Sequence, residues 1–219
     1  MTSAAAHTES ESLPGVIPVF PLAGALLLPR ARMPLNIFES RYLAMIRDAL
    51  EGEGVIGMIQ PSDAAEPPAL FDVGCAGRIE SCSETPDGRL LITLAGLCRF
   101  KVIEELPATT PYRQIKVDYG PYAGDLLTPL SQAGIDRPAL LAALSDYLDS
   151  RNLSVDWDAV DDAGDEALVH SLAAVCPFSV AEKQALIETE SLFERAETIT
   201  TLMTITASEP EEDGQAKPH

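Results

Sequence analysis

Residues 17–38 read IPVFPLAGALLLPRARMPLNIF, an apolar stretch interrupted by four prolines. A proline has no backbone N–H for a helix interior or a central sheet strand, and here prolines stand at Pro18, Pro21, Pro29 and Pro34. The stretch therefore predicts two short strands joined by an apolar loop. Its uncharged part, residues 13–29, is too short and too broken to span a membrane, which takes about 20 residues of helix.

The chain is strongly acidic, because 15 Lys and Arg side chains face 34 Asp and Glu, a net charge of −19 in 219 residues. Residues 1–120 carry 10 basic and 15 acidic side chains, whereas residues 121–219 carry 5 and 19. Such a chain repels nucleic-acid phosphates and anionic lipid surfaces. We therefore expect neither nucleic acid nor a membrane as its partner.

Both ends are polar and are predicted to be disordered tails, residues 1–15 and residues 208–219, the second of them acidic. The first has no basic start and no apolar run, so it is not read as a signal peptide, and the expected location is the cytoplasm. The four cysteines form no CxxC pair and are expected to stay as thiols there: Cys75, Cys82, Cys98 and Cys176.

Strand patterns dominate residues 16–122. Apolar residues alternate with polar ones around residues 98–102 and 115–119, and residues 55–59 form a short apolar run. The turn sequence TPDG at residues 85–88 predicts a hairpin between residues 73–82 and 89–95. One helix is expected, over residues 39–50, with Tyr42, Met45, Ile46 and Ala49 on its buried face. The pattern favours a small antiparallel β-barrel, which closes its own edges.

From residue 123 to residue 207 the apolar period becomes that of helices. Asp136 is expected to cap a helix with Pro138 in its first turn, and residues 165–175 predict another. Two capping boxes follow, formed by Ser179 with Glu182 and by Ser191 with Glu194. The predicted fold class is α+β, a barrel followed by a helical bundle.

Several segments in this order resemble the N-terminal, substrate-recognising domain of Lon proteases. They are PVFPL (18–22), MPL (33–35), FDVGCAGRI (71–79), PDGR (86–89), GLCRF (96–100), EKQALIE (182–188) and ER (194–195). Together they cover about residues 16–206. The resemblance implies a PUA-like β-barrel followed by helices, and a role in recognising polypeptides.

The chain departs from full-length Lon proteases in the parts that carry chemistry. A Walker loop needs a lysine directly after glycine to reach the nucleotide phosphates, and none of the four lysines follows a glycine. No segment remains for a protease domain with its serine and lysine. We therefore expect a freestanding recognition domain that is not an enzyme and uses no cofactor.

Other catalytic or metal-binding patterns are weak. His7 and His219 lie in the predicted tails, and His170 alone on a helix is more often structural than catalytic. The acidic residues between 156 and 166 lack the ligand spacing of a calcium loop. Cys82 and Cys98 with His170 do not have the spacing of a zinc site.

The first functional hypothesis is a module that binds protein or unfolded polypeptide segments, as an adaptor or regulator in protein quality control. An apolar run followed by basic residues suggests a patch rimmed by charge, and the candidate contacts are Leu26, Leu27, Leu28, Arg30 and Arg32. The alternative for these leucines is a strand packed inward. Met33 and Phe38 are expected in the core.

Two other classes remain as alternatives. PUA-like barrels include RNA binders, and Arg78, Arg89, Arg99 and Arg113 would have to form a basic stripe for that role. A hydrolase is the least favoured class, because no nucleophile, acid and base share a recognisable pattern.

Overall fold

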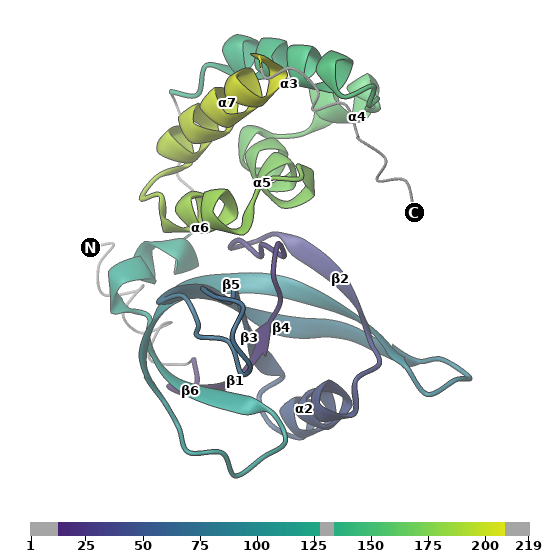
Figure 1. Ribbon diagram of the computed structural model, residues 1–219, viewed down its shortest axis with the longest axis vertical. Coiled ribbons are helices and arrows are strands. Elements are labelled where there is room, and N and C mark those ends of the chain that lie inside the picture. Colours follow the sequence, from purple (N-terminus) through teal and green to yellow (C-terminus); the bar gives the residue numbers. More distant parts are fainter. Residues whose placement is uncertain (1–12, 128–133, 209–219) are drawn as a thin grey trace, which may run out of the picture. The chain divides into compact units, whose positions relative to one another are not determined.

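The computed structural model of the chain describes residues 13–127 and 134–208 (Figure 1). Most of both predicted tails, residues 1–15 and 208–219, lies outside these ranges. Within them no helix has the length and apolar character needed to cross a membrane. The strands are β1 (Val16–Pro21), β2 (Arg32–Ile37), β3 (Val55–Ile59), β4 (Val73–Glu84), β5 (Leu90–Glu105) and β6 (Arg113–Asp118). The helices are α2 (Ser40–Glu51), the 3-10 helix η1 (Gly120–Leu126), α3 (Arg137–Ser150), α4 (Trp157–Asp162), α5 (Asp165–Val175), α6 (Val180–Glu188) and α7 (Leu192–Ser208).

The six strands form one sheet that closes into a barrel. Their order is β2-β5-β4-β3-β1-β6, and β5 also pairs with β6, which closes the ring. The predicted barrel followed by helices is therefore confirmed. The sheet is mixed rather than wholly antiparallel, because β1 pairs with β3 in parallel, with Val19 opposite Gly57.

Strand β5 makes closure possible because it is long enough to serve two neighbours. Its first half pairs with β2, from Ala95 opposite Arg32 to Leu90 opposite Ile37, and its second half pairs with β6. The two segments predicted around residues 89–95 and 98–102 are thus one strand. Register shifts in the β4–β5 and β5–β6 ladders bend the sheet.

The barrel interior is filled by alternate residues of the strands, as their period predicts. Phe100 lies at its centre and is fully buried. A Cβ atom added at Gly74 would lie 2.5 Å from the Phe100 ring, so glycine is required there by close approach. The core cluster comprises Ile17, Val19, Val55, Ile59, Ala76, Cys98, Phe100, Ile115, Val117 and Tyr119.

Helix α2 packs on the barrel with the face that the sequence predicts, since Tyr42, Met45, Ile46 and Ala49 are all buried. The Tyr42 ring lies 4.2 Å from that of Phe20 on β1, centroid to centroid. The Tyr112 hydroxyl donates to Asp48 Oδ2 at 2.7 Å and ties this helix to β6. The helix is therefore held at both its apolar and its polar side.

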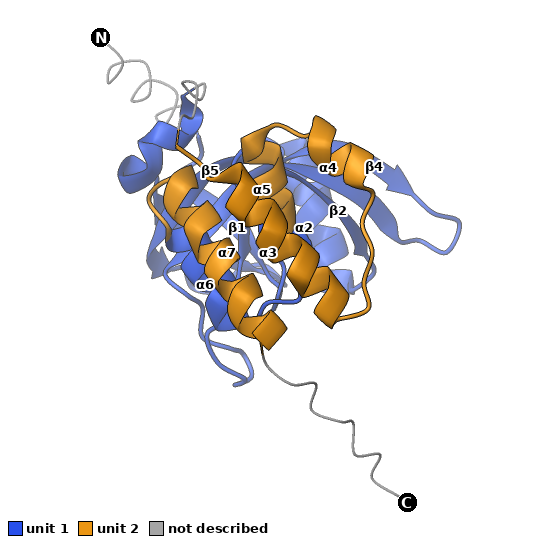
Figure 2. Ribbon diagram, turned by 90° about the horizontal axis from the view of Figure 1, so that it is seen from above, with its two compact units in different colours: residues 1–130, 173–188 blue, residues 131–172, 189–219 orange. Residues whose placement is uncertain are grey.

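The chain divides into two compact units, coloured in Figure 2. Unit 1 comprises residues 1–130 and 173–188, and unit 2 comprises residues 131–172 and 189–219. The sequence suggested a single boundary between residues 122 and 123, whereas this division groups α6 with the barrel. In unit 2, α3 packs against α7 through buried side chains that include Leu140, Leu144, Ala196, Ile199 and Met203.

The predicted helix caps are present. Asp136 Oδ1 accepts from the Ala139 amide at 3.0 Å. In the first capping box the Ser179 amide donates to Glu182 Oε2 at 2.7 Å, while Ser179 Oγ accepts from the Glu182 amide at 3.3 Å. The second box, formed by Ser191 and Glu194, repeats both bonds. Each box satisfies amides that a helix start leaves without partners.

Phe38 and Met33 do not lie in the core as the sequence suggested. Phe38 is 65% exposed rather than part of the core, because β2 ends at Ile37 and the side chain falls outside the sheet. Met33 is only half-buried. The acidic segment after residue 155 contains a short helix, α4. The Asp156 carboxylate caps the start of this helix by accepting from the amides of Asp158 and Ala159.

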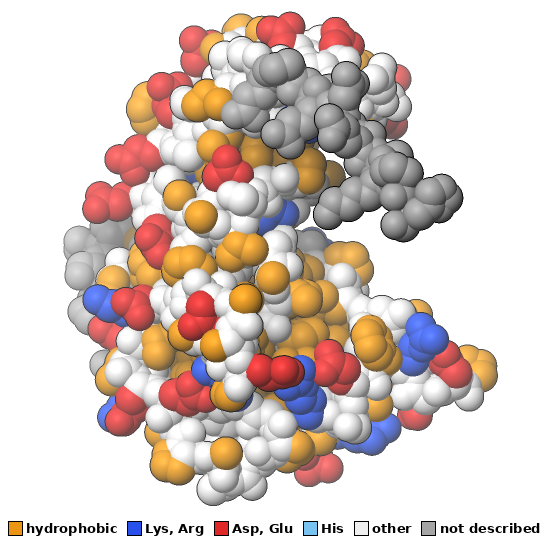
Figure 3. Space-filling model, viewed as in Figure 1, with side chains coloured by type: hydrophobic (Ala, Val, Ile, Leu, Met, Phe, Trp, Pro, Cys, Tyr) orange, Lys and Arg blue, Asp and Glu red, His pale blue; other side chains and the backbone are white. Residues whose placement is uncertain are grey.

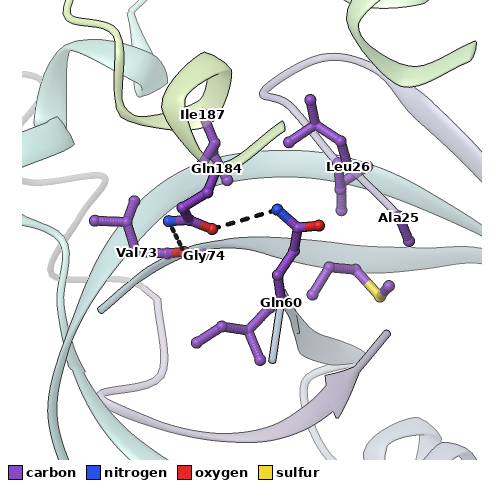
Figure 4. Close-up of a pocket in the computed structure, with 10 residues that line it drawn as sticks. Ala25, Leu26, Gln60, Val73, Gly74, Gln184 and Ile187 are labelled. Atoms are coloured by element: carbon purple, nitrogen blue, oxygen red, sulfur yellow. Dashed lines mark hydrogen bonds between the residues drawn. The ribbon is translucent and has the colours of Figure 1, made fainter. Parts of the chain in front are cut away.

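Buried polar side chains fasten α6 to the barrel within unit 1. Gln184 Nε2 donates to the Val73 carbonyl at 3.1 Å (Figure 4). Gln60 Nε2 donates to the Val180 carbonyl at 3.1 Å. The Lys183 ammonium donates to the carbonyls of Gly24 and Ala174, each at 2.8 Å. Such groups stay buried only when their hydrogen bonds are made. We call Gln60, Lys183 and Gln184 the polar clamp.

Arg99 on β5 joins the barrel to η1 and to α6. Its Nε and Nη2 donate to the two Asp125 carboxylate oxygens at 2.9 Å each, and its Nη1 donates to the Ile187 carbonyl at 3.0 Å. The guanidinium also lies 4.5 Å from the centroid of the Tyr122 ring. The strand pattern assigned Arg99 to the polar face, yet it is 6% exposed. A buried ion pair with these bonds explains the exception.

Replacing Arg99 by methionine should strongly destabilise unit 1, because it leaves the Asp125 carboxylate buried without its partner. We expect the free energy of unfolding to fall by about 3–5 kcal/mol in urea denaturation followed by circular dichroism. Arg32→Met is the matched control, since its ion pair with Glu80 is at the surface and should contribute nothing measurable. Equal losses in the two variants would contradict this role for Arg99.

Candidate functional site

The three leucines predicted as a binding patch are buried. Leu26, Leu27 and Leu28 are 3%, 1% and 0% exposed. They lie in the irregular segment between β1 and β2, and Leu27 packs so closely on β4 that a Cβ at Gly77 would lie 2.7 Å from it. The prediction that these side chains are exposed is wrong, because the apolar loop folds onto the barrel. The inward-facing alternative describes them better, although they do not form a strand.

The two basic residues after the leucines are exposed. Arg32 forms a bidentate ion pair with Glu80, with Nε–Oε2 and Nη2–Oε1 distances of 2.7 and 3.1 Å. The Arg30 guanidinium donates to the Asp125 carbonyl, and its backbone has a φ of 64°. Both side chains remain accessible to a partner, but each also has a structural bond.

The arginines suggested for RNA binding do not make one exposed stripe. Arg99 is buried beside Asp125, and Arg113 is paired with Glu105 at 2.6 Å. Arg89 is paired with Asp87 at 2.8 Å, and Arg78 donates to the Glu53 carbonyl. Carboxylates compensate the charges of Arg89, Arg99 and Arg113, which leaves the exposed Arg78 as a single positive charge and not as part of a stripe for phosphates.

Unit 1 instead contains an open groove of about 570 Å³, a volume within the usual range for ligand sites. It lies where the end of β1, the start of α2, β6 and the loop after β3 meet. Hydrophobic side chains stand beside basic and acidic ones on the face of the barrel in Figure 3. The groove is lined by Pro21, Arg41, Tyr42, Ala64, Ala65, Glu66, Pro67, Pro68 and Arg113.

The loop over residues 61–70 forms one wall of the groove and is fixed by its own hydrogen bonds. Its ends meet in a β-bridge between Pro61 and Leu70. Asp63 Oδ1 accepts from the amides of Ala65 and Ala69 at 3.1 and 2.9 Å, which closes the loop on itself. These bonds are local side-chain to backbone contacts of the kind that Asp favours in turns.

Arg113 ties the loop to the sheet. Its Nη1 donates to the Pro68 carbonyl at 2.7 Å, while Nε and Nη2 donate to the Glu105 carboxylate at 2.7 and 2.6 Å. Glu105 therefore compensates its charge, and this pair lowers the pKa of Glu105. The main role of Arg113 in the groove is to position the loop.

Two donors in the groove lack acceptors. Tyr42 is 6% exposed, and among the described residues its hydroxyl has no hydrogen-bond partner. Burial raises the pKa of this phenol, so it remains a neutral donor. Arg41 lies over the Tyr42 ring at 4.6 Å and uses Nε and Nη2 for Glu39, while its Nη1 has no acceptor in the described part of the chain. Both donors are open to the groove, where an oxygen atom of a ligand can accept a hydrogen bond from each of them.

A second cavity, of about 10 Å³, lies inside the polar clamp and is lined by Leu26, Gln60 and Gln184 among others (Figure 4). It has room for about one water molecule. It is therefore part of the packing and not a ligand site.

His170 and three of the four cysteines are buried. His170 is 4% exposed and accepts at Nε2 from the Arg195 guanidinium at 3.1 Å, since arginine can only donate. Burial raises the pKa of Cys75 well above its ordinary value, and those of Cys98 and Cys176 to about 12 and about 11. In residues 13–127 and 134–208, no three His, Cys, Asp or Glu side chains are grouped to hold a metal ion.

Comparison with known proteins identifies the family. The family model described as the ATP-dependent protease La (LON) substrate-binding domain matches residues 16–204. The chain is 26% identical over 210 residues to the Lon protease of Cytophaga hutchinsonii, which covers 90% of this chain and 25% of that protein. It is 31% identical over 113 residues to the Lon protease of Dictyoglomus thermophilum, covering 50% of this chain and 14% of that protein.

Solved structures show the same fold. The Lon N-terminal domain protein from Xanthomonas campestris aligns with a TM-score of 0.60 at 23% identity, covering 85% of this chain and 97% of that one. The N-terminal domain of Mycobacterium avium complex Lon protease aligns with a TM-score of 0.57 at 15% identity, covering 86% and 98%.

The chain belongs to the Lon substrate-binding domain family, as the sequence resemblance predicted. It spans about a quarter or less of the length of these two curated Lon proteases. The similarity therefore concerns the recognition domain.

The sequence did not reveal the groove. Its lining comes from β1, α2, β6 and a loop that reads as an ordinary turn region, and none of these segments carries a spacing rule. One residue could have indicated it. Tyr42 is predicted on the buried face of its helix, and a tyrosine hydroxyl at such a position usually has a hydrogen-bond partner.

Leu27 should matter for folding. Replacing Leu27 by alanine removes buried methyl groups beside Gly77 and should lower the free energy of unfolding by about 2–5 kcal/mol in urea denaturation. Leu91→Ala is the matched control, because Leu91 is 45% exposed and its loss should cost less than about 0.5 kcal/mol. A stable Leu27→Ala protein would mean that the leucine loop is not part of the core.

The cysteines should react unequally with iodoacetamide in the folded protein. Cys82 is exposed and should be alkylated first, whereas burial and raised pKa values should leave Cys75, Cys98 and Cys176 unmodified on the same time scale. Peptide mass spectrometry of a time course measures this order. Labelling in denaturant is the control, and fast labelling of Cys98 without denaturant would contradict the closed barrel.

Proposed function

We propose that this chain is a non-catalytic module that recognises segments of other polypeptides, as an adaptor or regulator in protein quality control. Membership of a substrate-binding domain family supports the class of ligand. The observation that carries the site is the groove with its two unused donors, the Tyr42 hydroxyl and the Arg41 guanidinium. We also infer a cytoplasmic location, which the four free thiols support.

The chemistry of the groove suits an extended chain. Its walls are mainly proline and alanine, which offer apolar surface without hydrogen-bonding side chains. The unused donors match the carbonyl oxygens that an unfolded segment exposes along its backbone. Binding through main-chain groups tolerates many sequences, as recognition of unfolded proteins requires.

Filling the groove should abolish binding without affecting the fold. Ala65 is exposed and lines the groove, so Ala65→Trp places a large ring in it while leaving the backbone bond to Asp63 in place. We expect this variant to bind fluorescein-labelled, reduced and carbamidomethylated lactalbumin at least about tenfold more weakly, measured by fluorescence anisotropy. Native lactalbumin should not bind either protein.

Two controls locate the surface. Ala108→Trp adds the same ring at an exposed alanine that does not line the groove, and it should bind like the unchanged protein. Arg32→Ala tests whether the basic residues near the leucines contribute. If Arg32→Ala loses binding and Ala65→Trp does not, the partner surface lies at residues 30–32 and the groove proposal is wrong.

A further inference from the structure

The groove has a charge pattern that the proposed function does not use. Three ionisable residues line it beside Tyr42: Arg41, Arg113 and Glu66. Both arginines are paired, with Glu39 and Glu105 respectively. Glu66 is exposed, and in the ranges that the structure describes it has no ion pair. When Glu39 and Glu105 are counted with the lining residues, the groove has two arginines and three glutamates, a net charge of −1.

The net negative charge of the groove indicates which kind of ligand group accepts hydrogen bonds from the Tyr42 hydroxyl and Arg41 Nη1. The choice is between a carboxylate and a neutral oxygen. A carboxylate on the ligand would face Glu39, Glu66 and Glu105 in a chain whose net charge is −19. A main-chain carbonyl accepts from the Tyr42 hydroxyl and from Arg41 Nη1 without that repulsion. The donors therefore fit the backbone of the ligand, and the unpaired Glu66 fits a cationic side chain on it.

We propose that the groove selects extended polypeptide segments that carry lysine or arginine, with Glu66 as the residue that determines this specificity. The Tyr42 hydroxyl binds a main-chain carbonyl, and the walls formed by Pro21, Pro67 and Pro68 pack against apolar side chains next to the basic one. The long-range field of the acidic chain favours the encounter. This inference rests on the proposed function, because it names the class of segment that the same groove takes.

Charge reversal on both sides tests the pairing. Two short fluorescein-labelled host peptides of alanine, leucine and serine are compared, identical except for a central lysine or glutamate. We expect the lysine peptide to bind more tightly at low salt, and Glu66→Gln to reduce that binding about two- to fivefold. Glu66→Lys should reverse the preference for lysine over glutamate. High salt should remove the difference between the peptides.

Two further variants separate this pairing from general electrostatics and from the backbone contact. Glu51→Lys makes the same change of charge at an exposed residue that does not line the groove, and it should leave the preference intact. Tyr42→Phe keeps the ring against Phe20 and removes only the hydroxyl, and it should weaken both peptides equally, about threefold.

The outcomes distinguish the inference from the function on which it rests. One outcome is that both peptides bind with equal affinity, that Ala65→Trp weakens both, and that Glu66→Lys changes neither. In that case the specificity for basic segments is wrong, while the groove remains the binding site. The same conclusion follows if Glu51→Lys reverses the preference as well as Glu66→Lys does. If neither peptide binding nor lactalbumin binding responds to Ala65→Trp, the proposed function itself fails.

Discussion

The polar clamp joins helix α6 to the segments that follow β1 and β3 and to the start of β4. Gln60 lies at the end of β3, just before the loop that forms one wall of the groove, and its Oε1 accepts from the Gly24 amide at 3.1 Å. Gly24 follows the end of β1, which supplies Pro21 to the groove, and its carbonyl accepts from Lys183. Two segments from the ends of different strands are thus fixed by one helix, α6. The groove is therefore organised before any ligand arrives, which lowers the entropy cost of binding.

The same clamp explains why α6 groups with the barrel rather than with the other helices. Buried polar groups are expensive to leave without partners, so Lys183, Gln184 and Arg99 hold this helix in one position. Apolar packing alone tolerates small shifts of a helix, whereas these donors each need a particular carbonyl or carboxylate. The frame of unit 1 is therefore rigid, and it holds the segments that line the groove in place.

Much of the fold could be predicted from the sequence, because periodicity and caps are local signals. The buried face of α2, the turn after β4 and both capping boxes follow from short-range chemistry that tertiary packing did not override. The leucines at residues 26–28 could not be placed, since a buried loop and an exposed patch have the same composition. Arg99 was missed because its partner Asp125 lies 26 residues away, and the groove because its walls meet only after the barrel closes.

The most direct test of the account is a map of backbone amide shifts by ¹⁵N NMR during titration with the lysine-containing host peptide. We expect the perturbed amides to cluster at Arg41, Tyr42, Ala64 to Glu66 and Arg113, with little change in residues 134–172. Shifts confined to those helical residues, or to the segment from Leu26 to Arg32, would contradict it.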